Sequence, residues 1–170
     1  MPKPLAKLDP PIPLLFDTIV LNNFLKAGRW DLLQGLSFRC LYITSQVYEE
    51  LKVAGLERPI REALATGWMK LAFLEKANEL DLYSQYSKTF GPGEASSLSL
   101  AILRGWAMAT DDLAARKAAR AAKIPLTGTI GIILNSIKRG LLTLEEGNGL
   151  LMKMKAEGYY SPFEELDELL

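Results

Sequence analysis

The chain has 170 residues and a mass of 18.8 kDa, which is enough for one domain with a full hydrophobic core. Its 20 basic and 20 acidic residues give a formal net charge of zero, so no overall basic field draws the protein onto nucleic acid. The absence of histidine from the sequence excludes a Ser-His-Asp triad, a Cys-His pair and a histidine-ligated metal.

The N-terminal residues 1–13 are rich in proline, and we expect them to be extended rather than to form a signal peptide. No apolar run in the sequence is long enough to span a bilayer. The single cysteine, Cys40, excludes an intramolecular disulfide and is interpreted as a buried strand residue. One free cysteine fits a reducing compartment, so we expect a cytoplasmic protein without membrane contact.

Short apolar runs alternate with helical patterns along the chain, which predicts an α/β fold with a mostly parallel sheet. In chain order, strands are predicted over residues 14–16, 40–43, 68–72 (at a sheet edge), 106–109 and 124–126. Helices are predicted over residues 19–27, 30–36 (or a turn), 46–54, 57–66, 75–83, 94–103, 113–120, 129–137 and 143–156, with a further helix starting at 161–162. We expect residues 1–170 to form a single domain in which 141–170 is a C-terminal helical extension.

Asp17 stands where the first predicted strand ends and the first helix begins. As a helix N-cap it would need no other role. Glu50 is harder to explain, because at about 100° per residue it falls on the apolar face of its helix with Val47, Leu51, Val53 and Ala54. A carboxylate on an apolar face costs several kcal/mol unless it is paired or binds a metal. The alternatives for Glu50 are a position at the edge of the core or a pair with an arginine, whereas Glu49 faces solvent.

Three more acidic residues lie at predicted helix starts. Glu94 opens the helix over residues 94–103, where favourable interaction with the helix dipole is the simpler explanation. Asp111 and Asp112 follow the strand 106–109, where either could cap the next helix and Asp112 could pair with Arg116 four residues on. Each residue has a structural explanation, but we consider it less probable that such explanations hold for all five.

In an open parallel sheet, strand ends and helix starts face one crevice, so these carboxylates are predicted to lie together. Carboxylates at one place repel each other unless a cation is present, and oxygen ligands favour Mg²⁺ or Mn²⁺. Such an ion can activate water for phosphodiester hydrolysis. We expect Asp17, Glu94, Asp111 and Asp112 to hold the ion, and Arg116 and Lys117 to hold phosphates of a nucleic acid backbone.

Several short segments resemble the PIN-domain family, in the VapC-like branch that includes predicted nucleic-acid-binding PIN proteins. These segments are Asp17-Thr18, residues 47–51, Gly93-Glu94-Ala95, Thr110-Asp111-Asp112 with Arg116, and residues 128–131. The resemblance implies an α/β/α sandwich, a Mg²⁺ or Mn²⁺ site and cleavage of single-stranded RNA. It also implies a homodimer and a small cognate antitoxin as partner.

The resemblance assigns catalytic roles to Asp17, Glu50, Glu94 and Asp112, with Thr110 orienting the site through its hydroxyl. Asp111 is then an auxiliary residue. Two departures from the family pattern are Asn22 and Asn23 after the first aspartate, and Glu94 where many relatives have aspartate. The first hypothesis is a metal-dependent ribonuclease and toxin. The alternatives are a PIN-like RNA-binding or interaction protein with weak or no catalysis, and a structural α/β protein whose carboxylates only cap helices.

Overall fold

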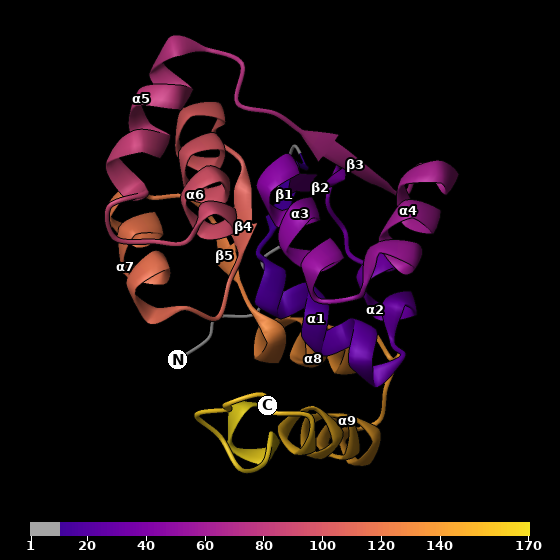
Figure 1. Ribbon diagram of the computed structural model, residues 1–170. Helices are drawn as coiled ribbons and strands as arrows, with labels where there is room; N and C mark the ends of the chain where they lie inside the picture. Colours follow the sequence, from indigo (N-terminus) through magenta and orange to yellow (C-terminus); the bar gives the residue numbers. More distant parts are fainter. Residues whose placement is uncertain (1–10) are drawn as a thin grey trace.

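The computed structural model describes residues 11–170, which are organised around one parallel sheet (Figure 1). The expectation for residues 1–10 lies outside these residues. In the described part of the chain the sheet has five strands in the order β3-β2-β1-β4-β5, and each neighbouring pair is parallel, as predicted. The strands are β1 (Leu14–Phe16), β2 (Leu41–Thr44), β3 (Met69–Ala72), β4 (Ala107–Ala109) and β5 (Leu126–Thr127).

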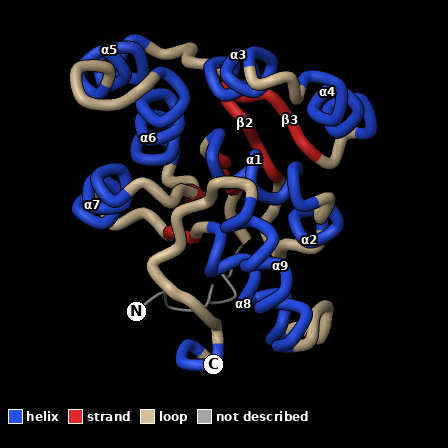
Figure 2. The backbone as a smooth tube through the Cα atoms, turned by 60° about the horizontal axis from the view of Figure 1, so that its bottom comes forward, coloured by secondary structure: helices blue, strands red, loops and turns tan. Residues whose placement is uncertain are grey.

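Different helices cover the two faces of the sheet, because successive strand residues point to opposite faces. Leu14 and Phe16 of β1 belong to the larger core cluster, whereas Leu15 between them packs with Leu98 and Ala115 in the smaller one. Figure 2 shows the resulting layers, which confirm the predicted α/β/α sandwich. The helices are α1 (Thr18–Ala27), α2 (Trp30–Gln34), α3 (Ser45–Val53), α4 (Glu57–Thr66), α5 (Ala77–Tyr86), α6 (Pro92–Arg104), α7 (Leu113–Ala121), α8 (Thr129–Lys138) and α9 (Leu144–Ala156).

The strand order reverses beside β1, because β2 and β3 lie on one side of it and β4 and β5 on the other. Ligands of open α/β sheets bind at such a switch point, outside the carboxyl ends of the strands. Phe16 pairs with Ala109 in register, and the backbone N–H of Asp17 donates to the Ala109 carbonyl at 2.9 Å. Asp17 and Thr110 therefore leave the sheet side by side at this crevice.

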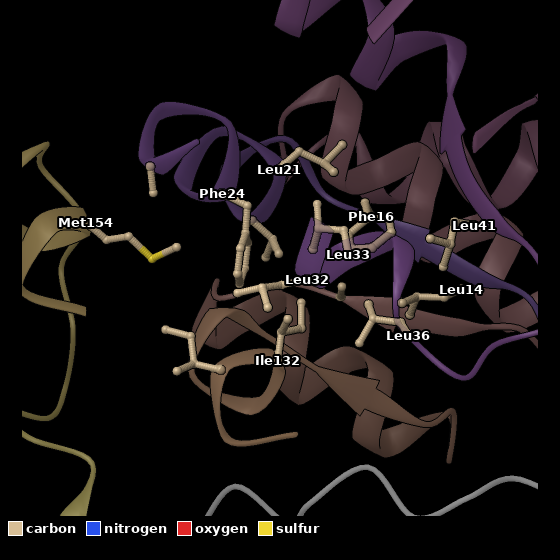
Figure 3. Packing of buried hydrophobic residues seen from close by; sticks show 14 of the residues in the cluster. Leu14, Phe16, Leu21, Phe24, Leu32, Leu33, Leu36, Leu41, Ile132 and Met154 are labelled. Atoms are coloured by element: carbon tan, nitrogen blue, oxygen red, sulfur yellow. The ribbon is translucent and has the colours of Figure 1, made fainter. Parts of the chain in front are cut away.

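Helix α9 packs on the rest of the domain through its apolar face. Met154 extends from α9 toward Phe24 of α1 in the core (Figure 3). Thr143 caps α9 as predicted, by accepting a hydrogen bond from the N–H of Glu146 at 3.1 Å. This helix thus belongs to the main core.

The prediction of another helix starting at residues 161–162 is wrong. Gly158 has φ +100° and ends the helical path, and the chain then runs irregularly to a 3₁₀ turn at Asp167–Leu169. The Ser161 hydroxyl accepts from the N–H of Phe163 at 3.1 Å, and the Asn148 side chain accepts from the N–H of Leu166 at 2.8 Å. Side chains thus satisfy backbone donors that a helix would have used.

Three smaller expectations also need correction. Val53 is 89% exposed, because it is the last residue of α3 and lies away from the face of Val47 and Leu51. Cys40 is half-buried and precedes β2 rather than lying within it. Helix α5 continues to Tyr86, beyond its predicted end at residue 83. Across residues 11–170, no helix combines the length and the apolar character needed to cross a membrane.

Candidate acidic site

Asp17 is buried at the carboxyl end of β1, with only 1% of its surface exposed. Its Oδ1 accepts a hydrogen bond from the N–H of Thr18 at 2.6 Å, so it is the N-cap of α1. Its Oδ2 accepts from the Thr110 hydroxyl at 3.1 Å. The residue is therefore both a cap and part of the crevice, and the two interpretations do not exclude each other.

Burial and negative neighbours raise the pKa of Asp17 to about 7. Loss of water around the carboxylate is the largest cause, followed by the charge of Glu94 and, more weakly, that of Glu50. The hydrogen bonds from Thr18 and Thr110 act in the opposite direction but do not outweigh these effects. The crevice therefore holds negative charge that no side chain of residues 11–170 neutralises.

Glu50 is fixed from two sides, and Glu49 beside it is exposed, as the helical wheel predicts. The N–H of Gly93 donates to Glu50 Oε1 at 2.8 Å, and the Thr18 hydroxyl donates to Oε2. A Cβ at position 93 would stand 2.9 Å from the carboxyl carbon of Glu50, so only glycine allows this approach. The carboxylate is thus held against the start of α6 rather than paired with an arginine.

Thr18 and Gly93 hold Glu50 in place, a role that was not predicted from the sequence. Both residues lie in segments that resemble the PIN-domain family, but no role was predicted for either of them. Glu50 was the sequence feature that could have indicated these roles. A carboxylate on an apolar face needs hydrogen-bond donors from neighbouring elements.

Glu94 is half-buried in the first turn of α6 and is close enough to other carboxylates to be affected by them. Burial, followed by the charges of Asp112 and Glu50, raises the pKa of Glu94. Asp112 caps α7, since its Oδ1 accepts from the N–H of Ala115 at 2.6 Å. The Thr110 hydroxyl accepts from the N–H of Asp112 at 3.2 Å, so it joins this turn to Asp17.

Asp111 points away from the other four carboxylates. Its Oδ1 accepts from the N–H of Thr129 at 2.8 Å and its Oδ2 from the Thr129 hydroxyl at 2.5 Å. Burial raises the pKa of Asp111, and the bonds from Thr129 and the nearby Arg116 oppose that rise. Asp111 fastens the start of α8 to the β4–α7 turn, and the structure does not bring it to the crevice as a predicted ligand.

The two predicted phosphate-binding residues of α7 differ in their surroundings. Arg116 does not pair with Asp112 as expected; its Nη1 donates instead to the carbonyls of Thr110 at 2.7 Å and Thr127 at 2.9 Å. Lys117 is exposed on the helix surface. Arg116 therefore braces the ends of β4 and β5, and Lys117 is free of that constraint.

Four carboxylates thus face the switch point, namely Asp17, Glu50, Glu94 and Asp112. Their oxygens are the donor type that Mg²⁺ and Mn²⁺ prefer, and their unbalanced charge favours a cation. Across residues 11–170, however, no three such side chains already converge in an arrangement that could hold an ion. The residues fit a divalent cation by donor type and charge, and ligation requires the side chains to draw closer together.

An open pocket of about 460 Å³ adjoins this site. Its lining includes Glu50, the exposed Glu49 and Val53 from α3, and Pro92 from the start of α6. The acidic site is therefore reachable from solvent at its Glu50 side, although Asp17 itself is buried.

A parallel sheet with acidic residues at the switch point defines an α/β protein with an anionic crevice at that point. The chain belongs to the PIN-domain family, because the family model described as a PIN domain matches residues 13–170. Proteins of this family are generally nucleases and typically use divalent metal ions.

Two further comparisons add little to this assignment. No curated protein sequence matches the chain. Among solved structures, the chain is similar to the crystal structure of FitAcB from Neisseria gonorrhoeae, with 18% identity and a TM-score of 0.45. The similarity covers 67% of this chain and 96% of that one, and the family assignment depends on the family model alone.

Proposed function

We propose that this protein is a metal-dependent endoribonuclease that hydrolyses phosphodiester bonds of single-stranded RNA. The observation that carries the proposal is the group of four carboxylates at the β1/β4 switch point, where the pKa of Asp17 is raised to about 7. Such a group is unfavourable without a cation, which supports a metal-binding role over a purely structural one. Membership of a family of nucleases supports the same reaction class.

In this proposal, Asp17, Glu94 and Asp112 hold Mg²⁺ or Mn²⁺. When bound, the ion would polarise a phosphate oxygen and favour ionisation of the attacking water. Thr110 positions two of these residues, since its hydroxyl donates to Asp17 and accepts from the N–H of Asp112. Glu50, held by the N–H of Gly93, keeps its carboxylate at the open side of the crevice.

The test is cleavage of labelled single-stranded RNA in the presence of Mn²⁺, compared with the same reaction in a chelator. The variant Asp112→Asn keeps an oxygen that can cap α7 but loses the charge, so we expect cleavage to fall at least about 100-fold. Glu49→Gln is the matched control, because Glu49 lies on the exposed side of the same helix as Glu50. Equal cleavage by the wild type and Asp112→Asn would exclude the proposed site.

We extend this proposal to a toxin of a toxin–antitoxin pair, acting as a homodimer and neutralised by a small antitoxin. Its support is the resemblance to VapC-like proteins, together with family membership. Induced expression in bacteria is then expected to arrest growth, and Asp112→Asn to abolish the arrest. Light scattering is expected to give twice the chain mass of 18.8 kDa. Normal growth during expression of an active nuclease would contradict the toxin assignment and leave the nuclease proposal intact.

One observation favours a second candidate, an RNA-binding PIN protein with little catalysis. In the described residues no three acidic side chains stand ready to hold an ion, and both Glu50 oxygens already accept hydrogen bonds. Binding of single-stranded RNA without Mn²⁺-dependent cleavage would establish this candidate.

A further inference from the structure

A second cleft lies on the other side of the β4–α7 turn from the acidic site. It has a volume of about 590 Å³, and its walls come from α7, the β5–α8 turn and the irregular segment after α9. Asp111 lines this cleft, while Asp112, the next residue, faces the acidic site. Because these two residues are consecutive, the β4–α7 turn borders both the cleft and the acidic site.

Two arginines one turn apart on α7 give the cleft a net positive charge. Arg116 is held by backbone carbonyls, as described above, whereas Arg120 is exposed and forms no ion pair with any described residue. Burial and the charge of Arg120 lower the pKa of Arg116, which shows that the two cations repel each other. The carboxylate of Asp111 does not neutralise both, because there are two positive charges to one negative.

Aromatic side chains also line the cleft. Tyr160 is 89% exposed, whereas Tyr159 and Phe163 are half-buried and pack against the main core. The segment that carries them is anchored: the N–H of Tyr159 donates to the Met154 carbonyl at 3.0 Å, and Leu166 is fully buried. Tyr160 is therefore an exposed aromatic ring on an anchored segment, and it is available to stack on a ligand.

Gly128 lines the cleft at a position where no side chain fits. A Cβ there would stand 2.5 Å from Asp111 Oδ1, 3.0 Å from the Thr110 carbonyl oxygen and 3.1 Å from Arg116 Nη1. Even an alanine at position 128 would therefore collide with Asp111, Thr110 and Arg116, which hold the strand ends and α8 together at the cleft. The hydrogen bonds of Arg116 and Asp111 thus fix the shape of the cleft beside Gly128.

We propose that this cleft binds the RNA segment next to the cleaved bond, with Arg120 contacting a backbone phosphate and Tyr160 stacking on a base. This inference rests on the proposed function, and it identifies where the unpaired strand is held. Proteins bind single strands by combining cationic side chains with exposed aromatic rings, which is the combination found here. The volume is within the range of small-molecule sites, which is enough for one nucleotide.

Two acidic residues of the segment after α9 have partners on α9. Glu164 pairs with Lys155 of α9 at 2.5 Å, and the Asp167 carboxylate accepts from the Asn148 side chain at 2.9 Å. Both contacts direct these carboxylates toward α9. A peptide is the competing occupant, and the experiment below distinguishes it.

The test measures binding of a labelled, 2′-O-methylated single-stranded oligonucleotide by fluorescence anisotropy, with a chelator present. Because the chelator removes the metal ion that the proposed hydrolysis needs, the strand stays intact and the result does not depend on nuclease activity. We expect Tyr160→Ala to weaken binding about tenfold and Tyr160→Phe, which keeps the ring, to bind like the wild type. Arg120→Gln is expected to weaken binding and to reduce the slope of log K against log salt by about one.

Arg58→Gln is the matched control for charge, because Arg58 is an exposed arginine of α4 on another part of the surface. Unchanged affinity in both Tyr160→Ala and Arg120→Gln would overturn the inference, and if the wild type still cleaves RNA, the nuclease proposal survives alone. Tyr160-dependent binding by a wild type that does not cleave would support the cleft and remove the nuclease proposal. No oligonucleotide binding by the wild type would overturn the inference and favour a peptide as occupant.

Discussion

Helix α6 connects two carboxylate sites that are equally buried and electrostatically opposite. Near its start, Asp17 is 1% exposed and its pKa is raised to about 7. Near its end, Glu79 is also 1% exposed, but its pKa is lowered to about 2. The difference comes from Arg104, whose Nε and Nη2 donate to Glu79 at 2.7 and 3.0 Å, with help from the N–H groups of Glu75 and Lys76.

Burial alone therefore does not decide what a carboxylate does in this protein. Glu79 has a counter-charge within the fold, so its ionised form stabilises the packing of α5 on α6. Within residues 11–170, Asp17 has only other carboxylates and neutral donors around it, so its ionised form lacks a counter-charge there. The first site is structural and the second is suited to binding.

The largest expected effect is on the structural site. Arg104→Met leaves Glu79 buried without its cation, and we expect the free energy of unfolding to fall by roughly 3–5 kcal/mol. Urea unfolding measures this, and Arg58→Met is the control, because its pair with Glu62 is exposed and contributes about 0–1 kcal/mol at most. A similar small loss in both variants would contradict the role of the pair.

The same pair predicts a loss of stability in acid. The pKa of Glu79 is 4.5 when unfolded and about 2 when folded, so its contribution is complete above pH 4.5 and disappears as pH falls toward 2. Wild-type stability is expected to fall over that window by about 3 kcal/mol more than the stability of Glu79→Gln. Parallel pH profiles of the two proteins would contradict this.

The next effect in size is expected on activity. Glu94→Gln removes one charge from the acidic site, and RNA cleavage is expected to fall at least about 100-fold. Asp111→Asn is the control, because Asp111 bonds to Thr129 and faces away from the crevice. We expect it to reduce stability, while cleavage by the folded fraction stays within about tenfold of the wild type. Equal loss of cleavage in both variants would indicate that Asp111 belongs to the acidic site.

A smaller effect is expected on stability without metal. The pKa of Asp17 rises from 3.8 unfolded to about 7 folded, so its cost to the fold is absent below pH 4, grows from there to pH 7 and is constant above. Asp17→Asn removes this cost, although the amide keeps only one acceptor oxygen for Thr18 and Thr110. We expect it to be more stable than the wild type by roughly 2–3 kcal/mol at about pH 8, and equal to it near pH 4. A destabilised variant at the higher pH would contradict the electrostatic argument.

The smallest effect concerns the fixing of Glu50. Thr18→Val removes the hydroxyl that donates to Oε2 and leaves the donor at Gly93 in place. We expect cleavage to fall about tenfold, the lower end of the loss seen when a group that orients a site residue is removed. Ser45→Ala is the control, since among residues 11–170 the Ser45 hydroxyl bonds only to the neighbouring Gln46. Unchanged cleavage in Thr18→Val would show that Glu50 needs no second donor.

The elements of the fold were largely predictable from local pattern. Apolar runs and helix caps located the five strands and the helices through α9, and the helical wheel separated Glu50 from Glu49. The irregular segment after Gly158 was not predictable, because its backbone donors are satisfied by Asn148 and Ser161 rather than by a repeating pattern.

The site was less predictable than the fold, because neighbouring residues with the same side chain act differently. Asp111 and Asp112 are adjacent, yet one binds Thr129 and the other faces Glu94. The pair of Glu79 with Arg104 joins residues 25 positions apart and left no local signal. Such contacts depend on how helices pack, which the sequence patterns used here do not specify.

The most direct test of the contrast between the two sites is a calorimetric titration of Mn²⁺ at about pH 8, above the pKa of Asp17 near 7. The wild type is compared with Asp17→Asn and with Glu49→Gln as a charge-matched control. If the carboxylates at the switch point form one cation site, the wild type and Glu49→Gln bind Mn²⁺ saturably and Asp17→Asn does not. Absence of binding in the wild type, or equal binding in all three proteins, would contradict that claim.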